Sequence, residues 1–496
     1  MEALVEFVND VIWSPPLVFL CLGTGLYFSV RTRFVQVRKF VEMVRLMRSG
    51  KASSRGVSSF QAMVMSLSGR VGTGNIAGVA TAITFGGPGA IFWMWVVAFF
   101  GASTAFVEST LSQIYKENRE DQYRGGPAYY IEKGLRMRWY AIAFAIVTII
   151  ACGVLLPGVQ ANSIASAFGN SFGIGTPVTG AVLVVLLGLV IFGGVKRIAR
   201  AAELIVPFMA LGYILIACAV IALNVDKLPT VVSLIFTSAF GLEASFGAVI
   251  GLAVQWGVKR GIYSNEAGQG TGPHASAAAE VEHPAQQGLV QAFSVYVDTL
   301  FVCSATAFMI LITGAYNVVA PAGRSIYRGV AGIKAGPGYT QHAIEMVLPG
   351  FGAAFVGIAL FLFAFTTLIA YYYIAETNVA YLSRKLGGAT STLVLRIAIL
   401  VATLYGAVQS ASVAWSLGDI GVGLMAWLNI VAIILLQRPA LKALWDYESQ
   451  KRDGKALTFV PKTIGVVNAT FWEDRIAKPL YSAQIHDEVT NDATGR

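Results

Sequence analysis

The sequence predicts an all-α protein that crosses a membrane eleven times. Three observations predict this fold class: 56% of the residues are hydrophobic and 13% are charged, long apolar runs alternate with short connections, and two of the runs are interrupted by glycines. Soluble domains usually contain about a quarter charged residues, and a helix needs ~20 apolar residues to cross a bilayer. A chain of 496 residues therefore has room for about ten to twelve spans.

The apolar runs define the predicted spans and divide the chain into four parts. The runs cover residues 12–30, 57–85, 88–115, 139–167, 176–194, 201–223, 241–273, 286–315, 350–382, 392–411 and 416–437. The parts are an N-terminal segment with one span (1–56), spans two to six (57–223), spans seven to eleven (224–437) and a polar tail (438–496). Residues 34–48 place valines on one helical face and basic residues mostly elsewhere, which is typical of a helix on the membrane surface.

The basic residues predict the orientation of the spans. The first, third and fifth connections are rich in Lys and Arg, whereas the second and fourth contain none. Cytoplasmic loops carry the excess of basic residues in membrane proteins. We therefore expect the N-terminus outside and the C-terminal tail in the cytoplasm, which requires an odd number of spans. The long connection 316–349, which would lie outside, carries three basic residues and fits this pattern less well.

The first interrupted run is SLSGRVGTGNIAG, residues 66–78. Glycine in a helix interior costs about 1 kcal/mol relative to alanine, and every backbone group freed in hydrocarbon needs a partner. An unwound segment between two half-helices directs carbonyls at a cation and amides at a carboxylate. The alternative is a helix kinked for close packing by small residues, but packing alone does not explain Arg70, Thr73 and Asn75 beside the glycines.

The second interruption is predicted within residues 247–272 of span seven. There, polar residues and glycine replace an apolar core: Gln255, Trp256, Gly257, Lys259 and Arg260. Spans two and seven are five spans apart, so they enter the membrane from opposite sides. This arrangement is typical of an inverted repeat, spans 2–6 against spans 7–11, with the ligand site where the broken helices cross. The alternative is a coincidence between two glycine-rich stretches.

Motifs at these positions resemble a known family. They are VGTGNIAGVATAI (71–83), GGPGAIFWMW (86–95), YRGGPAYYI (123–131), VQANSIA (159–165), WGVKRGIYSNEAG (256–268) and VDTLFVCSATA (297–307). Over about residues 12–440 the chain resembles the alanine or glycine:cation symporters of the amino acid–polyamine–cation superfamily. The resemblance implies the leucine-transporter fold with one extra N-terminal span. It also implies import of a small neutral amino acid, alanine or glycine, coupled to sodium or to protons, in a bacterial inner membrane.

The resemblance also implies the ligand sites. The substrate would contact residues of both broken helices and of span four: Gly72, Thr73, Gly74, Asn75, Gln160, Trp256 and Gly257. Sodium would be bound by carbonyl and hydroxyl oxygens of spans two and nine: Val71, Gly74, Phe363, Thr366 and Thr367. For the two threonines the alternative is ordinary hydrogen bonding to the preceding helical turn.

Six ionisable residues of the predicted spans require a role. Asp298 lies near the middle of span eight, where a carboxylate costs roughly 2.5–3.5 kcal/mol. It is expected either to bind a second cation or proton or to hold the first broken helix. Arg70 and Glu266 lie near the interruptions and are a candidate intracellular gate pair. Glu108, Glu203 and Glu376 fall near cytoplasmic span ends, where we expect snorkelling or solvated side chains.

Two other function classes compete with a symporter. An intramembrane enzyme would have its best candidate in GNSFG (169–173), a G-x-S-x-G match in an expected outside loop with no strand before it. A passive channel would favour one continuous polar pore over two broken helices. No P-loop occurs, so ATP-driven transport by this chain is not expected. The net charge of +9 would suggest nucleic-acid binding in a soluble protein, but in a membrane protein it is interpreted loop by loop. We expect a monomer that binds no nucleic acid.

Overall fold

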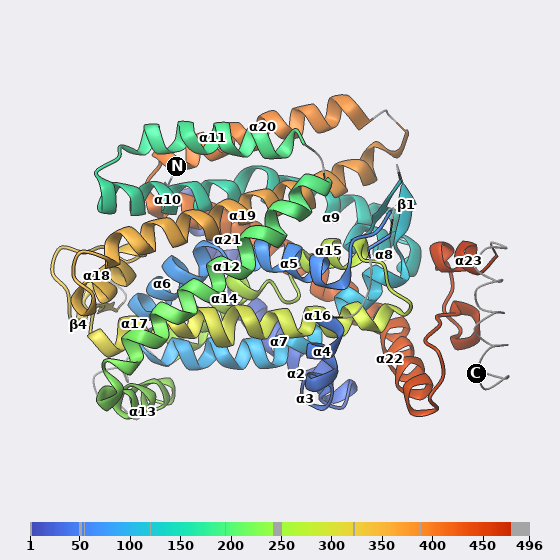
Figure 1. Cartoon of the computed structure of the whole chain (residues 1–496), viewed down its shortest axis with the longest axis horizontal. Helices are drawn as coiled ribbons and strands as arrows, with labels where there is room; N and C mark the ends of the chain where they lie inside the picture. Colours follow the sequence, from blue (N-terminus) through green and yellow to red (C-terminus); the bar gives the residue numbers. More distant parts are fainter. Residues whose placement is uncertain are drawn as a thin grey trace.

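The computed structural model describes residues 2–48, 52–53, 55–119, 121–193, 195–241, 250–320, 323–385 and 388–477. Figure 1 shows long helices that run side by side along the longest axis of the molecule. The strand hairpin that contains β4 lies at one end with α13 and α18, and we call this the hairpin end. At the other end lie β1, α8, α22 and α23, which we call the tail end.

The first half of the chain forms twelve α-helices, three π-helical turns and a short hairpin among its described residues. In order they are α1 (Glu2–Ile12), α2 (Pro15–Arg31), α3 (Val35–Arg38), α4 (Phe40–Met47), α5 (Ser59–Arg70), the π-helix η1 (Gly74–Gly78), α6 (Val79–Gly86), α7 (Gly89–Ile114), β1 (Glu117–Arg119), β2 (Gln122–Arg124), α8 (Pro127–Tyr130), η2 (Ile131–Leu135), α9 (Arg138–Ile150), η3 (Ala151–Leu155), α10 (Leu156–Phe172), α11 (Thr176–Ile191) and α12 (Val195–Ala222).

The second half forms eleven α-helices, one π-helix, three 3-10 turns and a second short hairpin among its described residues. Its elements are the 3-10 turn η4 (Val225–Lys227), α13 (Leu228–Ala239), α14 (Ile250–Asn265), α15 (Gly272–Ala278), α16 (Pro284–Tyr296), the π-helix η6 (Val297–Cys303), α17 (Ser304–Thr313), β3 (Asn317–Val319), β4 (Ser325–Arg328), α18 (Pro337–Val347), α19 (Gly352–Leu382), the 3-10 turn η8 (Ser383–Lys385), α20 (Gly388–Val408), α21 (Ala411–Leu435), α22 (Gln437–Arg452), the 3-10 turn η9 (Pro461–Ile464) and α23 (Thr470–Ala477).

Eight helical stretches of the described chain are long and apolar enough to cross a membrane, by length and composition. Each coincides with a predicted apolar run, and the shorter apolar helix α11 coincides with another. The two runs predicted to be interrupted are instead split into shorter helices, α5 with α6 and α14 with α15. An integral membrane protein is therefore the architecture that these helices support.

The first interruption lies where the sequence predicts it. Helix α5 ends at Arg70, the backbone of Val71 turns out of the helix (ψ 88°), and helical structure resumes at Gly74 as a π-turn. All of these residues are buried. Freed backbone groups at this depth need partners from other helices, and the site described below supplies them.

The second interruption lies within the predicted segment 247–272, but not at its polar residues 255–260. Helix α14 runs without a break through 255–260, and the chain leaves the helix only at Glu266–Thr271. Three residues there have positive φ: Glu266 (56°), Gly268 (83°) and Gly270 (88°). A left-handed conformation ends a helix, whereas a buried charge is tolerated inside one when it is paired. The first residues of the predicted segment, 247–249, lie outside the described residues.

The polar residues of 255–260 are paired instead of marking a break. Arg260 donates two hydrogen bonds to the Asp419 carboxylate of α21, at 2.8 and 2.9 Å. Lys259 lies 2.9 Å from the same carboxylate. These contacts explain how the helix keeps two cations in its buried part.

Three further expectations fail in the structure. Glu108 has 0% exposure and is not solvated. Glu376 forms a bidentate ion pair with Arg124, at 2.9 and 3.0 Å. The GNSFG segment is not a loop, because α10 continues to Phe172, and the Ser171 hydroxyl donates to the Ala353 carbonyl at 2.5 Å. A serine used for packing between α10 and α19 in this way offers no support for the enzyme alternative.

Candidate functional site

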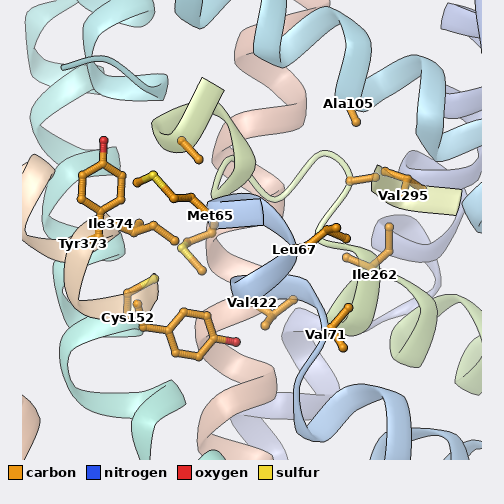
Figure 2. Close-up of a cluster of buried hydrophobic side chains, with 14 of the residues drawn as sticks. Met65, Leu67, Val71, Ala105, Cys152, Ile262, Val295, Tyr373, Ile374 and Val422 are labelled. Atoms are coloured by element: carbon orange, nitrogen blue, oxygen red, sulfur yellow. The ribbon is translucent and has the colours of Figure 1, made fainter. Parts of the chain in front are cut away.

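Side chains from distant elements bind the backbone that the first interruption frees. The Gly72 amide donates to Asn75 Oδ1 at 2.8 Å, and the Thr73 amide donates to Gln160 Oε1 of α10 at 3.1 Å. Figure 2 shows the apolar side chains around this segment, with Met65 beside Ile374 and Leu67 nearer to Val71. The unwound segment is therefore polar on its inner side and enclosed by apolar packing.

Gly72 is the point at which three helices approach one another. A Cβ atom at this position would clash with Thr367 Oγ1 of α19 and would lie 3.2 Å from Gln160 Oε1 of α10. Only glycine leaves the space between the unwound backbone, the amide oxygen and the hydroxyl. The unwound backbone, the Gln160 amide and the Thr367 hydroxyl thus meet at one point.

The oxygens predicted to bind sodium lie together on α19. Thr366 and Thr367 donate from their hydroxyls to the Phe363 carbonyl, at 2.9 and 3.0 Å. This is also the back-bonding that buried helical threonines commonly make. The two side chains differ in direction, because Thr367 faces Gly72 while Thr366 lies 3.9 Å from Met209 Sδ of α12. Carbonyl and hydroxyl oxygens of this kind suit a hard cation.

The two predicted span-two carbonyl ligands lie on either side of the break. Val71 is fully buried and its amide still donates to the Leu67 carbonyl. Gly74 faces α14, since a Cβ there would lie 3.1 Å from the Tyr263 ring, and its carbonyl accepts from the Val79 amide. Gly74 therefore lies nearer to the second broken helix than to α19.

Asp298 joins the two broken helices. Its carboxylate accepts from Asn75 Nδ2 at 2.6 Å, from Ser264 Oγ of α14 at 3.1 Å and from the neighbouring Thr299 hydroxyl at 2.7 Å. Asp298 is fully buried. A buried carboxylate is stabilised by such donors, and here the donors come from both sides of the helix crossing.

The second interruption is held by a carboxylate that sequence reasoning missed. Glu108 of α7 accepts from the Gly268 amide at 3.3 Å and from Asn429 Nδ2 of α21 at 2.7 Å. The same Asn429 amide donates to the Gly268 carbonyl at 2.9 Å. The signal available in the sequence was Asn429, a polar residue in the middle of an otherwise apolar run.

Arg70 and Glu266 lie close together without a direct ion pair among the described residues. A Cβ at Gly69 would lie 3.3 Å from Glu266 Oε2, and one at Gly272 would lie 2.7 Å from Arg70 Nη2. Arg70 donates to Ser294 and to the Gln291 carbonyl. Glu266 accepts from the Thr271 hydroxyl at 2.7 Å. A small cavity beside them is lined by parts of α5, α15 and α19, including Ser66 and Tyr373.

Trp256 and Gly257 lie at the far end of α6 from the first interruption. The Trp256 ring stacks on Phe85 with 4.7 Å between centroids. A Cβ at Gly257 would lie 2.6 Å from the Ala90 carbonyl of α7. Both residues thus pack α14 against α6 and α7. The aromatic residue of α14 beside the interruption is Tyr263, whose hydroxyl accepts from Gln160 Nε2 at 3.5 Å.

Comparison with known proteins gives consistent results over nearly the whole chain. The model of the sodium:alanine symporter family matches residues 1–461. The chain is 63% identical to the putative sodium/proton-dependent alanine carrier protein YrbD of Bacillus subtilis (strain 168), covering 95% of this chain and 98% of that protein. It is 54% identical to the sodium/proton-dependent alanine carrier protein of Bacillus sp. (strain PS3), covering 87% and 97%.

More distant similarities include a relative from an archaeon and a solved structure. The chain is 38% identical to the sodium/alanine symporter AgcS of Methanococcus maripaludis, covering 88% of this chain and 94% of that protein. Among solved structures, a Na⁺-coupled sialic acid symporter in a substrate-bound outward-open state aligns with a TM-score of 0.48 and 14% identity, over 94% of this chain and 96% of that one.

Proposed function

Since the chain belongs to the sodium:alanine symporter family, we propose that it is a secondary active symporter that imports alanine or glycine together with sodium by alternating access. The observation that carries the proposal is the convergence at Gly72 of unwound backbone, the Gln160 amide and the Thr367 hydroxyl. The groups that meet at Gly72 are polar and uncharged, which suits a zwitterion and a monovalent cation. The names of the relatives, which are alanine carriers dependent on sodium or protons, support the same substrates.

The proposed topology has eleven spans in a bacterial inner membrane. Eight long apolar helices, the shorter helix α11 and the two broken helices add up to this number: 8 + 1 + 2 = 11. The first span would precede two inverted five-helix units, residues 57–223 and 224–437. The basic connections support a cytoplasmic tail end, with the N-terminus outside. The tail, 438–496, would then lie in the cytoplasm, and its last residues, 478–496, are outside the described part.

The substrate would bind at the first interruption. Its carboxylate would accept from amides at Gly72, Thr73 and Gly74, and its ammonium group would meet the side-chain oxygen of Asn75 or Gln160. Tyr263, and not Trp256 or Gly257, is the aromatic residue that supports closure over this space, because its ring lies against Gly74.

Sodium would bind between the unwound segment and α19. Thr367 is the best-supported ligand because it faces Gly72, and the Phe363 carbonyl and the Thr366 hydroxyl lie within a hydrogen-bond distance of one another. The Val71 carbonyl would complete the set, with Gly74 a weaker candidate since its carbonyl already accepts a helical hydrogen bond. A cation here would stabilise the unwound segment, so that substrate and sodium bind together.

One sodium ion is enough to drive accumulation. An amino-acid zwitterion has no net charge, so each cycle would move one charge inward, worth about 2.3 kcal/mol per 100 mV. At about 1.4 kcal/mol per tenfold change, this sustains a roughly fifty-fold gradient. Proton coupling is the second candidate, favoured by the buried Asp298 carboxylate between the broken helices and by the two relatives named as sodium/proton-dependent. In the sodium reading Asp298 instead holds Asn75 and Ser264 in place.

Arg70 and Glu266 are proposed as part of the barrier on the tail side of the site. Both side chains are buried. Glu266 lies against Gly69 of α5, and Arg70 lies against Gly272 of α15. Arg70 Nε and Glu266 Oε1 have no hydrogen-bond partner within the described residues. Buried polar groups left without partners are costly. Separation of α5 from α15 would let both groups meet water, which would favour opening.

The test is alanine uptake into proteoliposomes that contain the purified protein. Uptake is measured with an inward sodium gradient, a matched potassium gradient and a pH gradient, for the parent, Thr367→Val, Thr366→Val and Thr403→Val. Thr403 is the control, because its hydroxyl makes the same back-bond within α20, to Ile399 at 2.7 Å, away from the site.

We expect sodium to drive uptake in the parent and in Thr403→Val, and Thr367→Val to raise the sodium concentration for half-maximal uptake at least tenfold. Uptake driven by the pH gradient alone would indicate coupling to protons, with Asp298 as the candidate proton-binding residue. If no gradient drives alanine or glycine uptake, the proposed substrate is wrong.

A further inference from the structure

The two half-helices at the tail end are fastened to each other. The Val57 amide, just before α5, donates to the Ala278 carbonyl at the end of α15 at 2.9 Å, and the Glu280 amide donates to the Val57 carbonyl at 2.8 Å. Helices α5 and α15 are the tail-side parts of the two broken spans. In an alternating-access cycle these are the ends that must separate before a ligand can leave toward the tail side.

Two side chains at the end of α7 hold the same backbone. Gln113 Nε2 donates to the Ala279 carbonyl at 3.1 Å, and Lys116 Nζ donates to it at 2.8 Å. Both side chains are fully buried. Ala279, which directly follows α15, is thus bound by side chains at the end of α7 and also lies beside Val57, just before α5.

Helix α23 of the tail holds the end of α7 in turn. Trp472 is 2% exposed, and its indole donates to the Gln113 carbonyl at 2.9 Å. Lys116 Nζ lies 4.4 Å from the Tyr123 ring centroid, 4.5 Å from that of Phe471 and 5.5 Å from that of Trp472. Aromatic faces at these distances attract an ammonium group. The tail therefore supplies two of the three aromatic rings that surround Lys116 Nζ, those of Phe471 and Trp472.

The tail also binds the chain beyond α15 directly. Arg475 donates to the Glu280 carboxylate at 2.7 Å and to the Val281 carbonyl at 3.3 Å, and Tyr123 donates to Glu280 at 2.8 Å. Figure 1 shows α23 at the tail end, beside α22 and β1. Residues 470–477 lie beyond the segment that the family model matches.

The Arg475–Glu280 pair is ionised at neutral pH. Burial alone would raise the pKa of Glu280, but the charges of Arg475 and Lys116 and the hydrogen bonds from Ser53 and Tyr123 outweigh it and lower the pKa below the ordinary 4.5. A carboxylate with a lowered pKa contributes its stabilisation above that ordinary value and loses it as the pH falls through the lowered one. The pair is therefore intact at any physiological pH.

We propose that α23 is a latch that holds the tail-side exit closed, by binding Gln113, Lys116 and Glu280 while α5 and α15 are together. The proposal rests on the alternating-access function given above. Separation of α5 and α15 moves Glu280 away from Arg475 and releases α23 from the end of α7. Loss of the latch shifts the resting population toward the state that is open to the cytoplasm.

The test is the accessibility of a single cysteine beneath the latch. Ser66→Cys is placed in a chain whose four native cysteines are changed to alanine, because Ser66 is 4% exposed and lines the cavity between α5, α15 and α19. Inside-out vesicles are treated at pH 7 with a membrane-impermeant methanethiosulfonate, and the rate of modification is measured without substrate. The same rates are measured with sodium and alanine present.

We expect Arg475→Ala and Trp472→Ala to raise the rate about tenfold and Arg475→Lys to restore most of the parent rate. The control is Arg452→Ala, which removes the same charge from the tail at a side chain that is 78% exposed, and it should leave the rate unchanged. Rescue by lysine separates release of the latch from misfolding.

Equal rates in the parent, Arg475→Ala and Trp472→Ala would overturn the latch. In that event a sodium- and alanine-dependent rate in the parent would still support alternating access. If sodium and alanine change no rate while Arg475→Ala raises it, the latch stands and the proposed transport cycle fails.

Discussion

The two interrupted helices are held by different chemistry. At the first interruption, the freed amides of Gly72 and Thr73 are bound by neutral side-chain oxygens of Asn75 and Gln160. At the second, the Gly268 amide is bound by the Glu108 carboxylate. At the first, Thr367 and Gln160 approach Gly72 too closely for a side chain, whereas the second contains two glycines with positive φ, Gly268 and Gly270.

This difference indicates a division of roles. Neutral partners leave the first interruption free to exchange them for a substrate and a cation, because a ligand can replace a weak hydrogen bond at small cost. A carboxylate partner and left-handed backbone make the second interruption a fixed support. Ligand binding is therefore expected to depend on the first interruption and protein stability on the second.

The largest expected effect is on Gly72. Gly72→Ala should lower alanine uptake more than a hundredfold, because its methyl group would occupy the space between Thr367 and Gln160. The measurement is the initial rate of uptake in proteoliposomes. Gly212→Ala is the control, since a Cβ at that helical glycine meets nothing within 4 Å. Normal uptake by Gly72→Ala would contradict the proposal that ligands bind at the first interruption.

Removal of Glu108 should mainly affect stability. Glu108→Ala leaves the Gly268 amide and the Asn429 side chain without their buried acceptor, which costs about 2–4 kcal/mol. The expected result is a clear fall in the midpoint of thermal unfolding in detergent. Glu203→Ala, which removes a half-buried carboxylate that accepts from Gln61 at 3.0 Å, should cost much less. An equal loss in both variants would contradict the support role.

Gly270 should show the combined cost of strain and close packing. Gly270→Ala places a Cβ 2.8 Å from Pro127 Cγ at a φ of +88°, and about 1–3 kcal/mol of stability should be lost. Gly173→Ala has a similarly positive φ, +66°, with nothing within 4 Å. Gly173→Ala therefore shows the stability lost through backbone strain alone. The difference in unfolding midpoint between the two variants then measures the stability lost through close packing at Gly270.

The smallest effect is expected at Trp256. Trp256→Phe keeps an aromatic ring beside Phe85 and should change the alanine concentration for half-maximal uptake less than threefold. Tyr263→Phe removes the hydroxyl that contacts Gln160, and it should change that concentration about three- to tenfold. A larger effect of Trp256→Phe than of Tyr263→Phe would indicate that Trp256, and not Tyr263, contacts the substrate.

The candidate site was predictable in part from local sequence. The first interruption could be located because four glycines and three polar residues stand together in an apolar run. The convergence of Gln160 and Thr367 on Gly72 was predictable only through the family resemblance. Glu108 was assigned to solvent because its place near the end of a run says nothing about Asn429, 321 residues later, which encloses it.

By itself, the sequence determined the helical membrane class, the positions of the apolar helices and the first interruption. These follow from hydropathy and from the helix cost of glycine, which are properties of neighbouring residues. The tertiary structure alone decided which part of span seven unwinds, which carboxylate supports it and where the tail binds. Each of these depends on whether a buried polar group finds a partner, and partners such as Arg260 and Asp419, 159 residues apart, meet only when the helices pack.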